Sequence, residues 1–242
     1  MRQFQDRFDA GRQLAELVRP YATKDMVVLG LLHGGMPVAF EVALTLGLPL
    51  DALPIAKLGL PGQAELALGA LGEDGVPVLN DALVRRLGID AGTIRALTKS
   101  ATAALESEAA RMEDVRPALD LGAKKSLVVD DGIATGATIR AACRIARARG
   151  AHSVIIAVPV IAAQAAIQLK EVSDELLAKV TAERFAAVGE FYGDFTQVSC
   201  DEVRHLLARA ARARDSRRGD PNPPSNSSHE PCELGGDLDT RS

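Results

Sequence analysis

The sequence predicts an α/β fold, in which a mostly parallel twisted sheet carries helices on both faces. Continuous apolar runs without polar alternation, typical of strands buried on both faces, occur at 26–32, 127–129 and 153–160. Segments with helical patterns separate these runs, and such alternation favours parallel strand pairing. The 242 residues, of which 47% are apolar and 25% charged, fit one globular domain with appendages.

Proline and glycine residues indicate where the predicted helices end. Pro20 ends the first helical stripe, and Gly47 and Gly150 each close a later helix. The predicted helices are 4–19, 38–46, 82–87, 90–112, 139–149, 162–170 and 202–214. The predicted strands are 26–32, 50–57, 125–131 and 153–160, with a weaker segment that extends to Val180. On the helix at 90–112, Glu106, Glu108, Arg111 and Glu113 are expected to form a solvated face.

Glycines punctuate residues 58–81 between short alternating segments such as Glu65–Ala70. The pattern predicts a glycine-rich hairpin that leaves the main sheet, beside a small hood. From Asp215 onward, Pro, Asn, Ser and Gly dominate and aromatic residues are absent. We therefore expect a domain over 1–214 and a disordered tail over 215–242.

Charge and cysteine content exclude several classes of protein. The 28 Lys and Arg against 32 Asp and Glu give a net charge of −4, which argues against nucleic-acid binding. Cys143, Cys200 and Cys232 form no CxxC pair, so a structural zinc site is not expected. The charged N-terminus has no apolar core of a signal peptide, and no apolar run approaches the ~20 residues of a membrane span. We expect a cytoplasmic protein without a membrane partner.

The strongest chemical pattern is the segment 127–138, Leu-Val-Val-Asp-Asp-Gly-Ile-Ala-Thr-Gly-Ala-Thr. An apolar strand delivers Asp130 and Asp131 to its carboxyl end, and a loop of small residues then opens a helix. Backbone N–H groups, the helix N-terminus and the hydroxyls of Thr135 and Thr138 would form an anion site sized for a monophosphate. The carboxylates would repel a phosphate, so they must face something else, and vicinal sugar hydroxyls are their natural partners. The segment therefore predicts a sugar-phosphate site.

This segment resembles the phosphoribosyl pyrophosphate signature of type I phosphoribosyltransferases. The resemblance implies that Asp130 and Asp131 are the catalytic acids and hold the ribose 2- and 3-hydroxyls. It implies a loop that binds the 5-phosphate through Ala134, Thr135, Gly136, Ala137 and Thr138. It also implies Mg²⁺, bound mainly through the substrate. An open alternative is the phosphoacceptor aspartate of a receiver-like domain, and a second is a solvated strand end with an ordinary turn.

Two further segments extend the resemblance. His33, Gly34 and Gly35 follow the first strand, where the family places the loop that binds pyrophosphate, although His33 stands where an arginine is usual. Lys57 matches the lysine of an Arg-Lys turn after the second strand, whereas Ala56 takes the arginine position.

The wider match covers about 4–207. It includes Phe4-x-Asp6-Arg7 and the aromatic stretch Val188–Phe195, which in purine members helps to receive the base. Before the signature strand, Glu113 and Asp114 replace basic residues of related sequences, and Arg116 and Pro117 are kept.

The expected function is Mg-dependent transfer of ribose 5-phosphate from phosphoribosyl pyrophosphate to a nitrogenous base or similar acceptor, with release of pyrophosphate. The alternative is a non-catalytic module that binds phosphoribosyl pyrophosphate or a nucleotide and regulates a partner, which the lost positive charges favour. An intact acid pair and phosphate loop are compatible with both. The sequence leaves open the acceptor and whether the chain forms a homo-oligomer.

Overall fold

A five-stranded, wholly parallel sheet forms the centre of the protein. The computed structural model describes residues 3–60, 63–73, 75, 77–116 and 119–218. The strand order is β2-β1-β6-β7-β8, and every neighbouring pair is parallel. The strands are β1 Met26–Leu31, β2 Leu50–Leu53, β6 Lys125–Val129, β7 Ser153–Ala162 and β8 Glu175–Ala182. The predicted α/β class is confirmed, and the weaker segment before Val180 is the edge strand β8.

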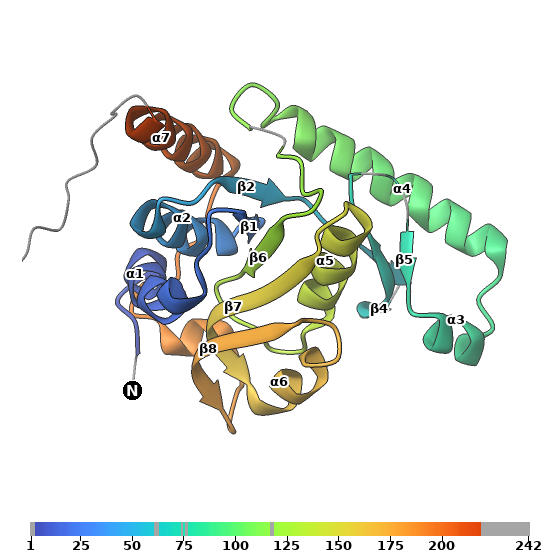
Figure 1. Cartoon of the computed structure of the whole chain (residues 1–242). Helices are drawn as coiled ribbons and strands as arrows, with labels where there is room; N and C mark the ends of the chain where they lie inside the picture. Colours follow the sequence, from blue (N-terminus) through green and yellow to red (C-terminus); the bar gives the residue numbers. More distant parts are fainter. Residues whose placement is uncertain (1–2, 61–62, 74, 76, 117–118, 219–242) are drawn as a thin grey trace, which may run out of the picture.

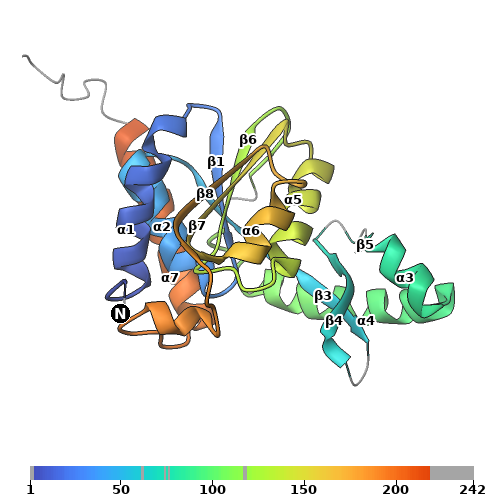
Figure 2. The same cartoon turned by 90° about the horizontal axis from the view of Figure 1, so that it is seen from below.

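Helices cover both faces of this sheet (Figures 1 and 2). On one face, α1 Arg7–Val18, α2 Gly35–Leu46 and α7 Cys200–Arg218 pack with Val28, Leu127 and Val129. On the other face, α5 Ala137–Ala148 and α6 Ala163–Leu169 pack with Val27, Leu29 and Val128. Since successive strand residues point to opposite faces, the continuous apolar runs supply both cores.

The register brings the carboxyl ends of three strands to one edge. Gly30 of β1 pairs with Val129 of β6, and Leu31 pairs with Leu53 of β2. The residues that follow these strands, which include His33 and Asp130, are therefore neighbours. Ligands of open α/β sheets bind at such carboxyl edges.

Residues 56–110 leave the main sheet and build a small subdomain. It contains an antiparallel sheet of β3 Ala56–Leu60, β4 Gln63–Leu71 and β5 Pro77–Leu79, followed by α3 Asp81–Leu87 and α4 Ala91–Ala110. Leu58, Leu71, Ala101 and Leu105 form its own buried cluster. Figure 2 shows this unit projecting from the side of the main sheet, and it confirms the predicted excursion.

Two predicted boundaries are wrong. The strand expected over 50–57 is divided, because β2 ends at Leu53 and β3 begins at Ala56 in the other sheet. Pro54, which lies between them, has no N–H to donate to a continued ladder.

The second error is the boundary expected at 215. Helix α7 continues to Arg218, and the Arg217 guanidinium donates a hydrogen bond to the Leu44 carbonyl at 2.9 Å. The rest of the expected tail, 219–242, lies outside the described residues. Two 3₁₀ turns, η1 Arg19–Tyr21 and η2 Val188–Phe191, complete the described chain. None of the described helices is both long and apolar enough to cross a membrane.

Candidate functional site

Asp130 and Asp131 stand at the carboxyl end of β6, at the centre of the sheet edge. The Asp131 N–H donates a hydrogen bond to Asp130 Oδ1 at 2.9 Å. The loop that follows is fixed to β7, since Ile133 N–H donates to the Val160 carbonyl and Ala162 N–H donates to the Ile133 carbonyl, both at 2.9 Å. The acid pair is therefore held by backbone contacts on both sides.

The glycine loop after β1 lies directly against this acid pair. A Cβ atom at Gly34 would stand 2.2 Å from Asp131 Oδ2, and one at Gly35 would stand 2.8 Å from the Val129 carbonyl oxygen. Real Cβ atoms do not make such contacts, so only glycine permits the approach. The structure thus brings the two predicted loops together.

His33, the first residue of this loop, contacts the subdomain. Its Nε2 lies 3.2 Å from Oε1 of Glu108 on α4. The expectation that Glu108 belongs to a solvated face is wrong, because this side chain is only 27% exposed and faces the loop. Glu108 thereby places a negative charge beside the segment expected to bind pyrophosphate.

The predicted phosphate loop opens helix α5. Gly136 precedes the helix with φ of +76°, a backbone conformation that glycine adopts without strain, and is packed against Leu169. No described side chain caps the first turn of α5, so its N–H groups and partial positive charge are free to meet an anion. Thr135 is exposed and Thr138 is half-buried. Ala134 and Ala137 are exposed as well.

Lys57 is the second residue of β3 and is exposed. Its positive charge acts to lower the pKa of Asp130. Ala56, by contrast, packs against the subdomain cluster. Arg116 does not supply the missing charge, since it is buried between Asp51, at 2.6 Å, and Glu73.

Asp131 is bound by an arginine to which the sequence analysis assigned no function. Arg7 Nε donates to Asp131 Oδ2 at 2.7 Å, and another guanidinium nitrogen donates to the Thr196 carbonyl at 2.7 Å. The Tyr192 hydroxyl donates to the Asp131 carbonyl at 2.6 Å, and Tyr192 is only 2% exposed. Tyr192 is therefore a core residue that supports the acid pair. A sequence signal for Arg7 exists, because Arg7 continues the stripe of Gly11, Leu14 and Val18 on the buried face of α1.

Burial and mutual repulsion perturb both acids. Burial raises the pKa of Asp130 well above its ordinary value, and the adjacent Asp131 carboxylate raises it further. Burial also raises the pKa of Asp131, while the hydrogen bond and charge of Arg7 oppose that rise. Two acids with such different partners are suited to different tasks.

Comparison with known proteins identifies the family. Residues 3–190 match the model of the phosphoribosyl transferase domain. The chain belongs to the phosphoribosyl transferase family. This is a family of transferase enzymes, and the resemblance of the acid pair and its loop is confirmed at that level.

Individual relatives agree with this assignment. The Mycobacterium tuberculosis protein Rv0571c, which bears a provisional phosphoribosyl transferase name, is 48% identical over 212 residues that make up 88% of this chain. The chain spans about half the length of such curated relatives, 48%. The crystal structure of TT1426 from Thermus thermophilus superposes with a TM-score of 0.79 at 38% identity, and the match covers 86% of this chain and 98% of TT1426.

Phosphoribosyl transferase chemistry with Mg²⁺ would use oxygen donors at this edge. The described residues contain no group of three His, Cys, Asp or Glu side chains that could hold a metal ion. Asp131 Oδ2 is already bound to Arg7, so Asp130 is the freer carboxylate. This donor set fits an ion that takes most of its ligands from substrate and water.

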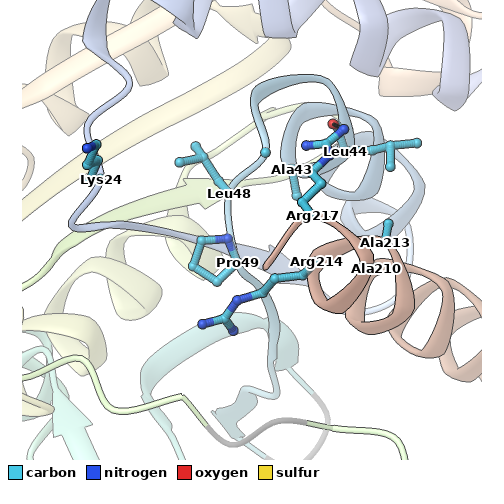
Figure 3. A pocket seen from close by; sticks show the side chains of 10 residues that line it. Lys24, Ala43, Leu44, Leu48, Pro49, Ala210, Ala213, Arg214 and Arg217 are labelled. Atoms are coloured by element: carbon cyan, nitrogen blue, oxygen red, sulfur yellow. Dashed lines mark hydrogen bonds between the residues drawn. The ribbon is translucent and has the colours of Figure 1, made fainter. Parts of the chain in front are cut away.

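A cavity of about 240 Å³ lies elsewhere on the molecule. Lys24, Leu48, Pro49, Arg214 and Arg217 are among the residues that line it (Figure 3). Lys24 and Pro49 precede β1 and β2, so this cavity lies at the amino ends of the strands. The acid pair lies at the carboxyl ends, and none of the predicted site residues lines the cavity.

Proposed function

We propose that the chain is a Mg-dependent transferase that moves ribose 5-phosphate from phosphoribosyl pyrophosphate to a nitrogenous base or a similar acceptor, and releases pyrophosphate. The observation that carries the proposal is the contact between the acid pair and Gly34-Gly35, beside the uncapped N-terminus of α5. In this proposal, the subsites for phosphate, ribose and diphosphate are adjacent, in the order in which these groups are joined in the donor.

Each group of the donor has a matching surface. The first turn of α5, with Thr135 and Thr138, binds the 5-phosphate through N–H and hydroxyl donors. Asp130 accepts hydrogen bonds from ribose hydroxyls, and Asp131 supports it. The backbone of Gly34 and Gly35 can approach the diphosphate closely, and Lys57 adds charge at the rim.

The reaction breaks the bond between ribose C1 and the diphosphate oxygen, and a bond from C1 to the acceptor nitrogen forms. The electron pair of the broken bond leaves with pyrophosphate, and the proton released by the acceptor nitrogen passes to pyrophosphate or to solvent. The ribose ring becomes cation-like in the transition state, as in other glycosyl transfers, so fixed carboxylates nearby stabilise it. When bound, Mg²⁺ would supply positive charge to the leaving diphosphate.

A binding module without turnover is the second candidate, because Glu108 places a negative charge beside the diphosphate loop. Pyrophosphate release measured with a panel of bases, together with calorimetric titration of phosphoribosyl pyrophosphate, separates the two functions. The transferase predicts binding and base-dependent release. Binding without release by any base supports the module, and absence of binding contradicts both.

A further inference from the structure

Arg7 is a buried cation whose side-chain hydrogen bonds lead to Asp131 and to the segment that supports it. The residue is 8% exposed. Its guanidinium binds Asp131 Oδ2 and the Thr196 carbonyl, each at 2.7 Å. The same group lies 3.8 Å from the centre of the Phe195 ring, a cation–π contact that fixes its plane.

Stability alone does not explain an arginine at this position. The other members of the stripe, Gly11, Leu14 and Val18, are buried without charge. An apolar side chain that replaces a buried ion pair commonly leaves stability unchanged or increases it. The planar guanidinium of Arg7 orients one oxygen of the Asp131 carboxylate and links it to the Thr196 carbonyl. An apolar side chain cannot make these two hydrogen bonds.

Three segments of the chain contact Asp131. Arg7 of α1 binds Oδ2, and the Tyr192 hydroxyl binds the Asp131 carbonyl. A Cβ at Gly34 would lie 2.2 Å from the same Oδ2, so the glycine loop packs on it. Within the described chain, Asp130 makes no such contact with a cation and has the Asp131 N–H bound to Oδ1.

We propose that Arg7 is the positioning residue of the acid pair, which fixes Asp131 as an oriented anion and leaves Asp130 as the acid that meets the sugar hydroxyls. This inference rests on the proposed function, because it gives the two acids separate tasks toward the same ribose. Arg7 touches no substrate in this role and acts through Asp131.

The proposal has a signature in pH dependence. The groups that face Asp131 are Arg7 of α1, Asp130 directly after β6 and Tyr192 directly after η2. Lys57 of β3 acts on Asp130. Arg7 is the cation in contact with Asp131, so its removal raises the pKa of Asp131 further. Ligand binding that needs the Asp131 anion must then fail at a higher pH.

The experiment compares Arg7→Gln with Arg12→Gln. Arg12 lies on the same helix, is 53% exposed and has its nearest carboxylates, on Asp9 and Glu41, at 3.8 Å. Calorimetric titration with ribose 5-phosphate at several pH values measures the affinity. It also gives the acid limb, which is the pH range over which the affinity falls on acidification. We expect Arg7→Gln to weaken binding at neutral pH by about 10-fold or more and to move the acid limb to higher pH. Arg12→Gln should change neither.

Two further variants guard against a fold defect. Arg7→Lys keeps the charge and should leave the acid limb near that of the wild type, even if the lost fork weakens affinity. In an Asp131→Asn background, Arg7→Gln should change affinity by less than about 2-fold, because the partner through which it acts is gone. Carbon NMR titration of the Asp131 carboxyl, without ligand, reports the contact independently.

The outcomes separate the two hypotheses. A wild type that binds neither ribose 5-phosphate nor phosphoribosyl pyrophosphate overturns the proposed function and, with it, the ligand role of Arg7. A wild type that binds, with an Arg7→Gln protein of the same acid limb and the same Asp131 titration, overturns this inference alone. Equal effects of Arg7→Gln with and without the Asp131 carboxylate would also overturn it.

Discussion

Gly34 marks the closest approach between the two loops of the site. Its missing side chain makes room for the Asp131 carboxylate, which Arg7 holds in place. The two loops are therefore in direct contact at this point. A change of one methyl group at this point tests how much the site depends on that contact.

The substitution Gly34→Ala should therefore damage both stability and binding. The added Cβ would overlap Asp131 Oδ2, and such overpacking costs ~1–3 kcal/mol. Thermal unfolding and ribose 5-phosphate titration measure the two losses. The control is Gly122→Ala, where the nearest atom is the exposed Asp120 carboxylate at 3.2 Å. Equal melting temperatures of the two variants would contradict the close contact.

Asp130 and Asp131 should respond oppositely to loss of charge. Burial raises the pKa of Asp130, so the folded state binds its proton more tightly than the unfolded state does. Ionisation of Asp130 therefore destabilises the fold as pH rises above the unfolded value of ~3.9. Asp130→Asn removes this cost and keeps the acceptor for Asp131 N–H.

We expect Asp130→Asn to stabilise the ligand-free protein at neutral pH by on the order of 1 kcal/mol, with a gain that disappears in acid. Asp131→Asn should instead destabilise it by about 3 kcal/mol, because Arg7 is left buried without its anion. Chemical denaturation at several pH values measures both. Destabilisation by both variants at neutral pH would count against the raised pKa of Asp130.

The residues that the sequence could not place are those with distant partners. Arg7 and Asp131 are 124 positions apart, and only the fold shows that they meet. Glu108 has an exposed helical pattern, yet the subdomain carries it to His33. Asp130 and Thr135, by contrast, belong to one local pattern whose chemistry is complete within a few residues, whereas Gly34 was assigned to the site through the family resemblance.

At the scale of elements, β6 and α5 act as one unit. The apolar strand, the small-residue loop and the helix start are encoded in consecutive residues, which is why the sequence predicted them well. The features that the sequence did not predict depend on contacts between residues far apart in the chain. The extension of α7 depends on the hydrogen bond from Arg217 to the Leu44 carbonyl. The division of β2 from β3 depends on a second sheet, in which the residues after Pro54 pair.

The start of α5 gives the prediction at this scale. Replacing Thr135 and Thr138 together by alanine removes two hydroxyl donors and keeps the backbone N–H groups. At ~1.5–3 kcal/mol for each charge-assisted bond, affinity for ribose 5-phosphate should fall by about 100-fold or more. The matched control replaces Thr98 and Thr102, whose hydroxyls bond to carbonyls of their own helix α4. Unchanged affinity in the first variant would refute the phosphate assignment.

At the scale of the whole molecule, the subdomain is tied to the sheet around the site. Arg116 joins Asp51 of β2 to Glu73 beyond β4, and Arg144 of α5 donates to the Leu79 carbonyl of β5 at 3.2 Å. The contact of His33 with Glu108 is a further tie, and it lies at the loop assigned to diphosphate. Binding of a polyanion there must overcome the Glu108 charge.

Substitution of Glu108 by glutamine tests this coupling. Loss of the negative charge should tighten binding of phosphoribosyl pyrophosphate by roughly 10-fold, since like-charge repulsion of about 1 kcal/mol or more is relieved. Binding of ribose 5-phosphate, which has no diphosphate, should barely change. The comparison of the two ligands separates the loop from a general gain in net charge, which would favour both.

Glu106→Gln is the matched control, because Glu106 is exposed on the same helix and changes net charge equally. Calorimetric titration of both ligands against both variants gives four affinities. A selective gain for phosphoribosyl pyrophosphate in Glu108→Gln alone places the diphosphate beside His33. Equal gains in the two variants would mean that Glu108 acts only through net charge. No gain in either would mean that the loop does not face the diphosphate, and the assignment of Gly34 and Gly35 to that group would fail.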